Sequence, residues 1–217
     1  MTLKREQRVT VLSGDLIAST QHQRDHTEKA LRDLDQRANR VAGWQGQSFA
    51  YFSRFRGDGW QIVLYAPEHA LRATLYLHAY LRIFKILPAT RISIGLGQMD
   101  PWDGGDLSTA SGSAFEASGR GLDNMPKSRR FMISGDGVTP LHHAIIAMVE
   151  DQAFGWSPEQ AEAISRYLLP NRPTLKDIAQ DIEISTQAVH ARISGAHGQT
   201  LRQTVELWEE YERNHHA

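Results

Sequence analysis

The sequence predicts an α+β fold, in which an antiparallel sheet carries two helices and is followed by a segment made only of helices. Up to about residue 135, short runs rich in β-branched and aromatic residues alternate with longer runs whose apolar residues recur every three or four positions. From about residue 139 only the helical pattern remains. We therefore expect two domains, residues 1–137 and residues 138–217.

The first half of the sheet domain follows from local patterns. VTVLSGD (residues 9–15) predicts a strand that ends near Asp15, and the apolar spacing in residues 26–42 predicts a helix. Residues 48–56 alternate, and WQIVLY (residues 60–65) predicts the next strand. Gly57-Asp58-Gly59 lies between these two strands, and Asp-Gly is a strong signal for a hairpin.

The second half repeats the pattern and extends it. Pro67 opens a strongly apolar helix that ends before Pro88, and TRISIGLGQ (residues 90–98) predicts a strand. A Gly- and Asp-rich loop, a short helix to about Leu122 and a last strand at residues 131–134 follow. The order β-α-β-β-α-β predicts a ferredoxin-like split βαβ unit, with one additional helix and strand.

Composition limits the function classes. The chain has 217 residues, a net charge of -1 and no cysteine, which excludes disulfides, thiol catalysis and cysteine-ligated zinc. The N-terminal apolar run is short and interrupted, unlike a signal peptide, and no stretch approaches the roughly 20 apolar residues of a membrane helix. We expect a cytoplasmic protein without a membrane partner.

Two aspartates are candidate metal ligands. In the split βαβ order, the end of the first strand lies beside the central hairpin, so Asp15 and Asp58 should meet. Two close carboxylates repel unless a cation lies between them, and Mg²⁺ or Mn²⁺ held with substrate phosphates is a suitable cation. Each aspartate also has a simpler explanation, Asp58 as a turn residue and Asp15 as a capping carboxylate.

Four motifs, in order, resemble those of class III adenylate and guanylate cyclases. SGDLIAST resembles their FTDIVGST stretch, and FRGDGWQIVLY resembles their second metal-binding motif. TRISIGLG resembles their RIGIHTG strand, and GSAFEASGRGLD resembles their GDxVNxAARL helix. Together with the C-terminal segment described below, the whole chain resembles the SatD-like bacterial proteins, which carry such a palm domain followed by a helix-turn-helix.

The resemblance implies a metal- and nucleotide-binding site. Asp15, Asp58 and the backbone carbonyl of Leu16 match the cyclase metal ligands, and Ser19 and Thr20 match the triphosphate-binding loop. A nucleoside triphosphate with Mg²⁺ or Mn²⁺ is the implied ligand.

Other matched positions concern catalysis. Arg120 matches the arginine that stabilises the transition state, but the cyclase asparagine four residues earlier is Glu116 here, an anion that should not help a phosphate transition state. Arg54 stands at the base-selecting lysine, so the purine preference cannot be carried over. Because cyclase sites combine residues of two subunits, the resemblance implies a homodimer.

The C-terminal segment contains the spacing of a helix-turn-helix at residues 174–196. Leu175, Ile178 and Ala179 line one face of its first helix, and Ser185 can cap the second. The usual turn glycine is Glu183, which would strain the bend by about 1 kcal/mol or require another geometry.

The second of these helices would present residues to double-stranded DNA in a major groove. The candidate DNA-binding residues are Ser185, Thr186, Gln187, His190 and Arg192. Residues 157–217, however, hold six Lys and Arg against nine Asp and Glu, which favours weak DNA binding or a purely structural use of the motif.

Three functions fit these patterns. The first is a transcriptional regulator whose metal- and nucleotide-binding palm controls a DNA-binding module. The second is an active nucleotidyl cyclase or nucleotidyltransferase with Asp15 and Asp58 as metal ligands. The third is a catalytically inactive protein-interaction module.

Overall fold

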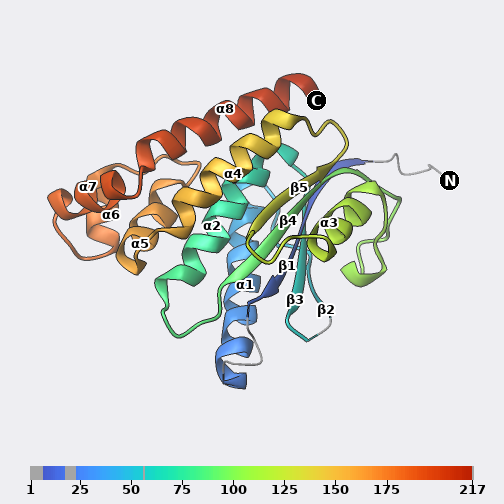
Figure 1. Cartoon of the computed structure of the whole chain (residues 1–217), viewed down its shortest axis with the longest axis horizontal. Coiled ribbons are helices and arrows are strands. Elements are labelled where there is room, and N and C mark those ends of the chain that lie inside the picture. Colours follow the sequence, from blue (N-terminus) through green and yellow to red (C-terminus); the bar gives the residue numbers. More distant parts are fainter. Residues whose placement is uncertain (1–6, 18–22, 56, 217) are drawn as a thin grey trace.

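The computed structural model describes residues 7–17, 23–55 and 57–216, which form a five-stranded sheet covered by helices (Figure 1). The strands are β1 (Gln7–Leu16), β2 (Phe52–Phe55), β3 (Gly59–Leu64), β4 (Thr90–Met99) and β5 (Phe131–Gly135). The helices are α1 (Arg24–Trp44), α2 (Ala70–Ile83), α3 (Ser113–Asp123), α4 (Pro140–Phe154), α5 (Pro158–Tyr167), α6 (Leu175–Asp181), α7 (Thr186–Gly195) and α8 (Gly198–His216).

The sheet has the strand order β2-β3-β1-β4-β5, with β1 in the centre. The first four strands pair antiparallel, in the order of a split βαβ unit. The fifth strand pairs parallel to β4, so the expectation of a wholly antiparallel sheet is wrong and the sheet is mixed. The reason is that α3 connects β4 to β5, and a crossover helix returns the chain in the same direction.

Different helices pack on the two faces of the sheet. Alternate residues of β1 divide between them: Leu12 and Leu16 join the main apolar core with α1 and α2, whereas Val9 and Val11 join a smaller core with Ala114 of α3. The prediction that two helices share one face is therefore confirmed for α1 and α2, and Figure 1 shows α3 on the other side of the sheet.

Several element boundaries differ by a few residues from the sequence prediction, including those of α1 and β2. The helix expected at residues 26–42 extends to Arg24–Trp44, and the strand expected at residues 48–56 shrinks to Phe52–Phe55. Pairing with β3 stops at Phe52, and the ring of the preceding Tyr51 lies edge-on to Trp102, with 4.7 Å between the ring centroids.

The C-terminal helices complete the burial of α2. This helix is buried on nearly all sides, including Arg72 and His78, which are 4% and 5% exposed. Its outer side meets α4, α5 and α8, and one apolar cluster includes Leu12 of β1 together with Ile164 of α5 and Trp208 of α8. The predicted domain boundary at residues 137–138 remains a prediction, and the apolar core is continuous across it.

A buried ion pair joins α8 to α2. The Arg72 guanidinium donates from Nε to Glu209 Oε1 at 2.5 Å and from Nη2 to Glu209 Oε2 at 2.8 Å. His69 lies 2.9 Å from the same carboxylate. Burial raises the pKa of Glu209, but hydrogen bonds from Arg72 and His69 outweigh it, so the pKa is lower than normal. The carboxylate is thus held in its charged form, and removing one partner of a buried pair is costly.

The close packing of α3 on β4 depends on glycine. A Cβ added to Gly95 would lie 2.2 Å from the backbone oxygen of Ala114, which cannot move aside like a flexible side chain. A Cβ on Gly119 of α3 would meet nothing within 4 Å.

The same substitution at these two glycines should therefore have opposite effects. We expect Gly95→Ala to lower the free energy of unfolding by about 1–3 kcal/mol, because it overpacks the α3–β4 contact. Gly119→Ala should raise it by about 0.5–1 kcal/mol, because alanine restricts the unfolded chain and favours helix. Urea unfolding followed by circular dichroism measures both, and equal effects would contradict the packing described.

Candidate functional site

The two candidate metal ligands meet at one end of the sheet. Asp15 lies opposite Gly59 in the β1–β3 ladder, and the N–H of Leu16 donates to the backbone oxygen of Asp58 at 3.3 Å. Both aspartates are partly buried. The structure therefore brings Asp15, Leu16 and Asp58 together, as the sequence predicts. We call this place the aspartate edge.

An arginine pairs with one of the two carboxylates. Arg91 of β4 lies directly opposite Asp15 in register and donates to both of its carboxylate oxygens, from Nε at 2.8 Å and from Nη2. Its pKa is raised by the hydrogen bond to Asp15 and by the charges of Asp15, Asp58 and Asp123, although partial burial acts in the opposite direction. Arg91 is thus the cation of the aspartate edge in this structure.

Buried hydrogen bonds fix the backbone beneath Asp15. The indole N–H of Trp60 donates to Thr90 Oγ1 at 2.9 Å, and this hydroxyl lies 2.9 Å from the carbonyl oxygen of Asp15. Both Trp60 and Thr90 are fully buried. The end of β1 is therefore fixed from both neighbouring strands.

The donor set of the aspartate edge suits a hard cation. Carboxylate and carbonyl oxygens are the ligands that Mg²⁺ prefers, and one or two carboxylates suffice when phosphates complete the shell. Within the described part of the chain, no cluster of three or more His, Cys, Asp or Glu could hold a metal by itself. Ser19 and Thr20, predicted to bind phosphate, lie outside the described residues.

The predicted catalytic arginine pairs within its own helix. Arg120 Nη1 donates to Glu116 Oε2 at 3.2 Å, and both side chains are more than two-thirds exposed on α3. Arg54 makes a two-point contact with Glu28 of α1, at 3.0 and 2.9 Å. Arg54, Glu116 and Arg120 are therefore engaged with partners other than Asp15.

Sequence reasoning missed Arg91, Thr90 and Trp60. All three lie near the start of strands that the sequence predicts, β4 for Thr90 and Arg91 and β3 for Trp60. Only the register of β1 against β4 places Arg91 opposite Asp15, and a one-residue shift would move it to the other face of the sheet.

The second candidate site is the surface of α7. Ser185 caps this helix by accepting the N–H of Ala188 at 3.1 Å, as predicted, and Glu183 has the left-handed φ of +53° that a turn glycine would adopt freely. The side chains of Thr186, Gln187 and His190 are exposed.

Arg192 differs from its exposed neighbours on α7. Its Nη1 donates to Glu162 of α5 at 2.8 Å, so the one arginine predicted to face DNA is bound to the protein. The predicted helices are present as α6 and α7, and their use in DNA binding remains a prediction.

Two solved cyclase domains align with part of the chain. No protein-family model matches the chain, and no curated protein matches it. The active GGEEF domain of a diguanylate cyclase from Vibrio cholerae aligns with a TM-score of 0.41 and 15% identity, over 61% of this chain and 85% of that one. The guanylyl cyclase Cya2 aligns with a TM-score of 0.39 and 16% identity, over 56% of this chain and 72% of that one. Likeness at this level assigns neither family nor activity, and membership of the SatD-like group remains a prediction.

None of the helices in the described part of the chain combines the length and the apolar character needed to cross a bilayer.

The hydroxyl of Thr90 should be important for stability. We expect Thr90→Val to lower the free energy of unfolding by about 1–3 kcal/mol, because it leaves the buried Trp60 N–H and the Asp15 carbonyl without their shared partner. Thr10→Val is the matched control, since its hydroxyl has a single hydrogen bond of 3.4 Å, to Pro67, and should cost less. Chemical denaturation of both variants tests this, and an equal loss would contradict the proposed support of Asp15.

Proposed function

We propose that the aspartate edge binds a nucleoside triphosphate together with Mg²⁺ or Mn²⁺, and that the protein acts there as a nucleotidyl cyclase or related nucleotidyltransferase. The observation that carries this proposal is the meeting of Asp15 and Asp58, from distant segments, at one end of the sheet. Carboxylates brought together in this way favour a cation between them.

Asp15 and Asp58 would hold the metal through their carboxylates, and Leu16 would hold it through its carbonyl. When bound, such ions neutralise phosphate charge and favour attack by a hydroxyl. Asp15 must first release Arg91, because both of its oxygens accept hydrogen bonds from that guanidinium.

Arg91 gains a function once it leaves Asp15. Its guanidinium stays charged at any physiological pH and offers paired donors that match phosphate oxygens. Arg91 would then contact the triphosphate that the metal accompanies. The pair with Asp15 holds the arginine close to this position before the nucleotide binds.

Arg120 would act from a second copy of the chain. Its exposed position on α3 and its weak exposed pair with Glu116 leave it available to a partner surface. This part of the proposal requires a homodimer with sites between the copies, as the cyclase resemblance implies.

A turnover assay tests the proposal. Purified protein is incubated with Mn²⁺ and each common ribonucleoside triphosphate, and products are resolved by mass spectrometry. We expect a cyclic or linked nucleotide whose formation falls at least about a hundredfold in Asp58→Asn, because several kcal/mol of charge stabilisation is lost.

Asp103→Asn is the control for that assay, since Asp103 lies in an exposed loop where it accepts the N–H of Gly105. Binding of a fluorescent triphosphate is measured in parallel. Binding that needs Asp58 and Mn²⁺ but yields no product would identify a nucleotide-controlled regulator instead. Neither binding nor product would refute both functions.

DNA binding by α7 is a second candidate function, favoured by the exposed row of Thr186, Gln187 and His190. We expect weak binding of duplex DNA at low salt with a shallow salt dependence, because few cations are available to contact phosphates. Gln187→Ala should weaken it, and Lys127→Ala, outside α7, should not. Fluorescence polarisation measures this, and no binding at micromolar protein and low salt would exclude it.

A further inference from the structure

A hollow lies where α2 ends and the C-terminal helices begin. Its lining comes from the end of α2 and the following loop, from Arg130 before β5, and from the junction of α4 with α5. It is on the α1 and α2 side of the sheet, because Leu81 and Leu87 of its lining belong to the main core. Asp15 shares the opposite face with Val11 and Ser13, so the hollow is separate from the aspartate edge.

Three cations line this hollow, and the nearby Glu159 at the start of α5 interacts electrostatically with one of them, Lys85. Within the described residues, no carboxylate lies within ion-pair distance of Arg82, Lys85 or Arg130. Arg82 donates from Nε to the carbonyl oxygen of Trp156 at 2.9 Å, which leaves its two terminal nitrogens for another acceptor. Arg130 uses Nη1 for the carbonyls of Lys127 and Arg129, and its Nε is buried without a partner. The hollow therefore has an excess of positive charge and unused donors.

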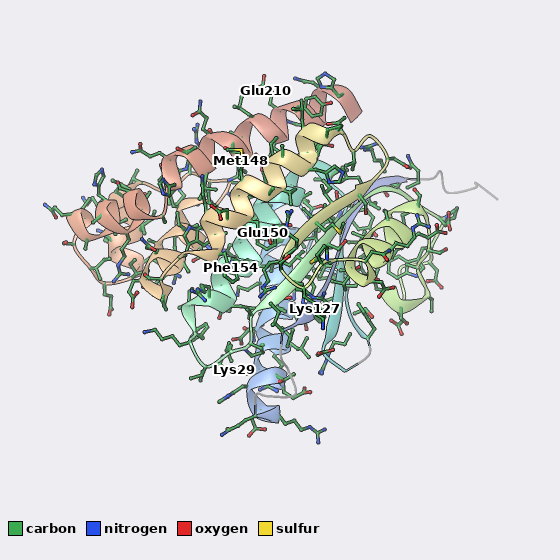
Figure 2. The ribbon with its side chains drawn as sticks, viewed as in Figure 1. Lys29, Lys127, Met148, Glu150, Phe154 and Glu210 are labelled. Carbon is green, nitrogen blue, oxygen red and sulfur yellow. The ribbon has the colours of Figure 1, made fainter. Side chains whose placement is uncertain are left out.

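The position of Arg130 is fixed by its neighbours. The buried carboxylate of Glu150 accepts both the backbone N–H of Arg130 and the Nε of Arg129, at 2.5 Å for the latter. Figure 2 shows Glu150 on α4, one turn before Phe154. The ion pair of Glu150 is with Arg129, and its contact with Arg130 is to the backbone N–H.

The remaining wall is apolar and aromatic. Phe154 is 53% exposed at the end of α4, with the Arg130 guanidinium 5.3 Å from its ring centroid. Phe84 lies on the other side, with Lys29 Nζ 5.1 Å from its ring. His78 lines the base, and burial lowers its pKa to about 4, so this imidazole is neutral at physiological pH.

We propose that this hollow is a second ligand site, which binds a small molecule carrying a phosphate or carboxylate group on a flat apolar portion. Arg82, Lys85 and Arg130 contact the anionic group, and Phe84 and Phe154 contact the flat portion. A few converging polar groups on an apolar wall are characteristic of small-molecule sites. Charged hydrogen bonds from arginine are the strong ones for such anions.

The position of this site connects both parts of the chain. Its lining includes α2, which packs against the sheet, and the α4–α5 junction that precedes α6 and α7. A ligand here contacts the end of α2 and the start of α5 at the same time. The site is independent of the proposed nucleotide function and would exist if that function failed.

Phenyl phosphate is the probe for this proposal, with inorganic phosphate and benzyl alcohol as partial probes. Titrations of the full chain are followed by NMR of the Phe and backbone signals. We expect saturable binding of phenyl phosphate at millimolar concentration, with weaker binding of either partial probe, because each lacks one of the two contacts.

Lys85→Gln tests the cations without disturbing the core, since Lys85 is exposed. It should weaken phenyl phosphate binding roughly five- to tenfold, the loss expected for one charged contact. Lys176→Gln is the matched control, because it removes the same charge from an exposed position of α6 and should leave binding unchanged. A melting temperature equal to that of the parent confirms that each variant is folded.

Two results would overturn the proposal. One is the absence of saturable phenyl phosphate binding to the parent chain. The other is an equal loss of binding in Lys85→Gln and Lys176→Gln, which would show that the anion responds to overall charge only. Stronger binding of inorganic phosphate than of phenyl phosphate would remove the aromatic contacts from the site and contradict the ligand class.

Discussion

The structure depends on the burial of α2 from both sides. One side of this helix packs on the sheet with α1, and the other carries Arg72 and His78, which would be exposed without the C-terminal helices. Glu209 of α8 neutralises Arg72, and the carbonyl oxygen of Ala153 of α4 lies 3.3 Å from His78 Nε2. Removing one partner of a buried ion pair is costly, so the Arg72–Glu209 pair ties the position of α8 to that of α2.

The aspartate edge follows from strand pairing. Because β1 is central, its end lies between the start of β3 and the start of β4, and each neighbour contributes a charged residue or a turn. Arg91 compensates the repulsion that Asp15 and Asp58 would otherwise feel. The Asp15 carboxylate thus has a cationic partner without a ligand. A metal ion must interact with this carboxylate more favourably than Arg91 does in order to replace the arginine.

Much of this architecture could be predicted from the sequence, because it follows from local patterns. The split βαβ order, the meeting of Asp15 with Asp58 and the Ser185 cap all depend on periodicity and turn chemistry. Features that depend on register or on packing between distant elements could not be predicted. Arg91 opposite Asp15 requires the β1–β4 register, the pairing of Arg192 with Glu162 requires the packing of α7 on α5, and the parallel β5 requires the path of α3.

The short edge strand β2 has a consequence for association. It is the end strand of the sheet, comprises only Phe52–Phe55, and has the turn Leu107–Thr109 packed beside it. Four residues present only about two outward backbone N–H groups and two carbonyls to a neighbouring strand. Strand addition at β2 is therefore unfavourable. Any partner that approaches from this side would have to bind through side chains, so its affinity would respond to salt and to single substitutions.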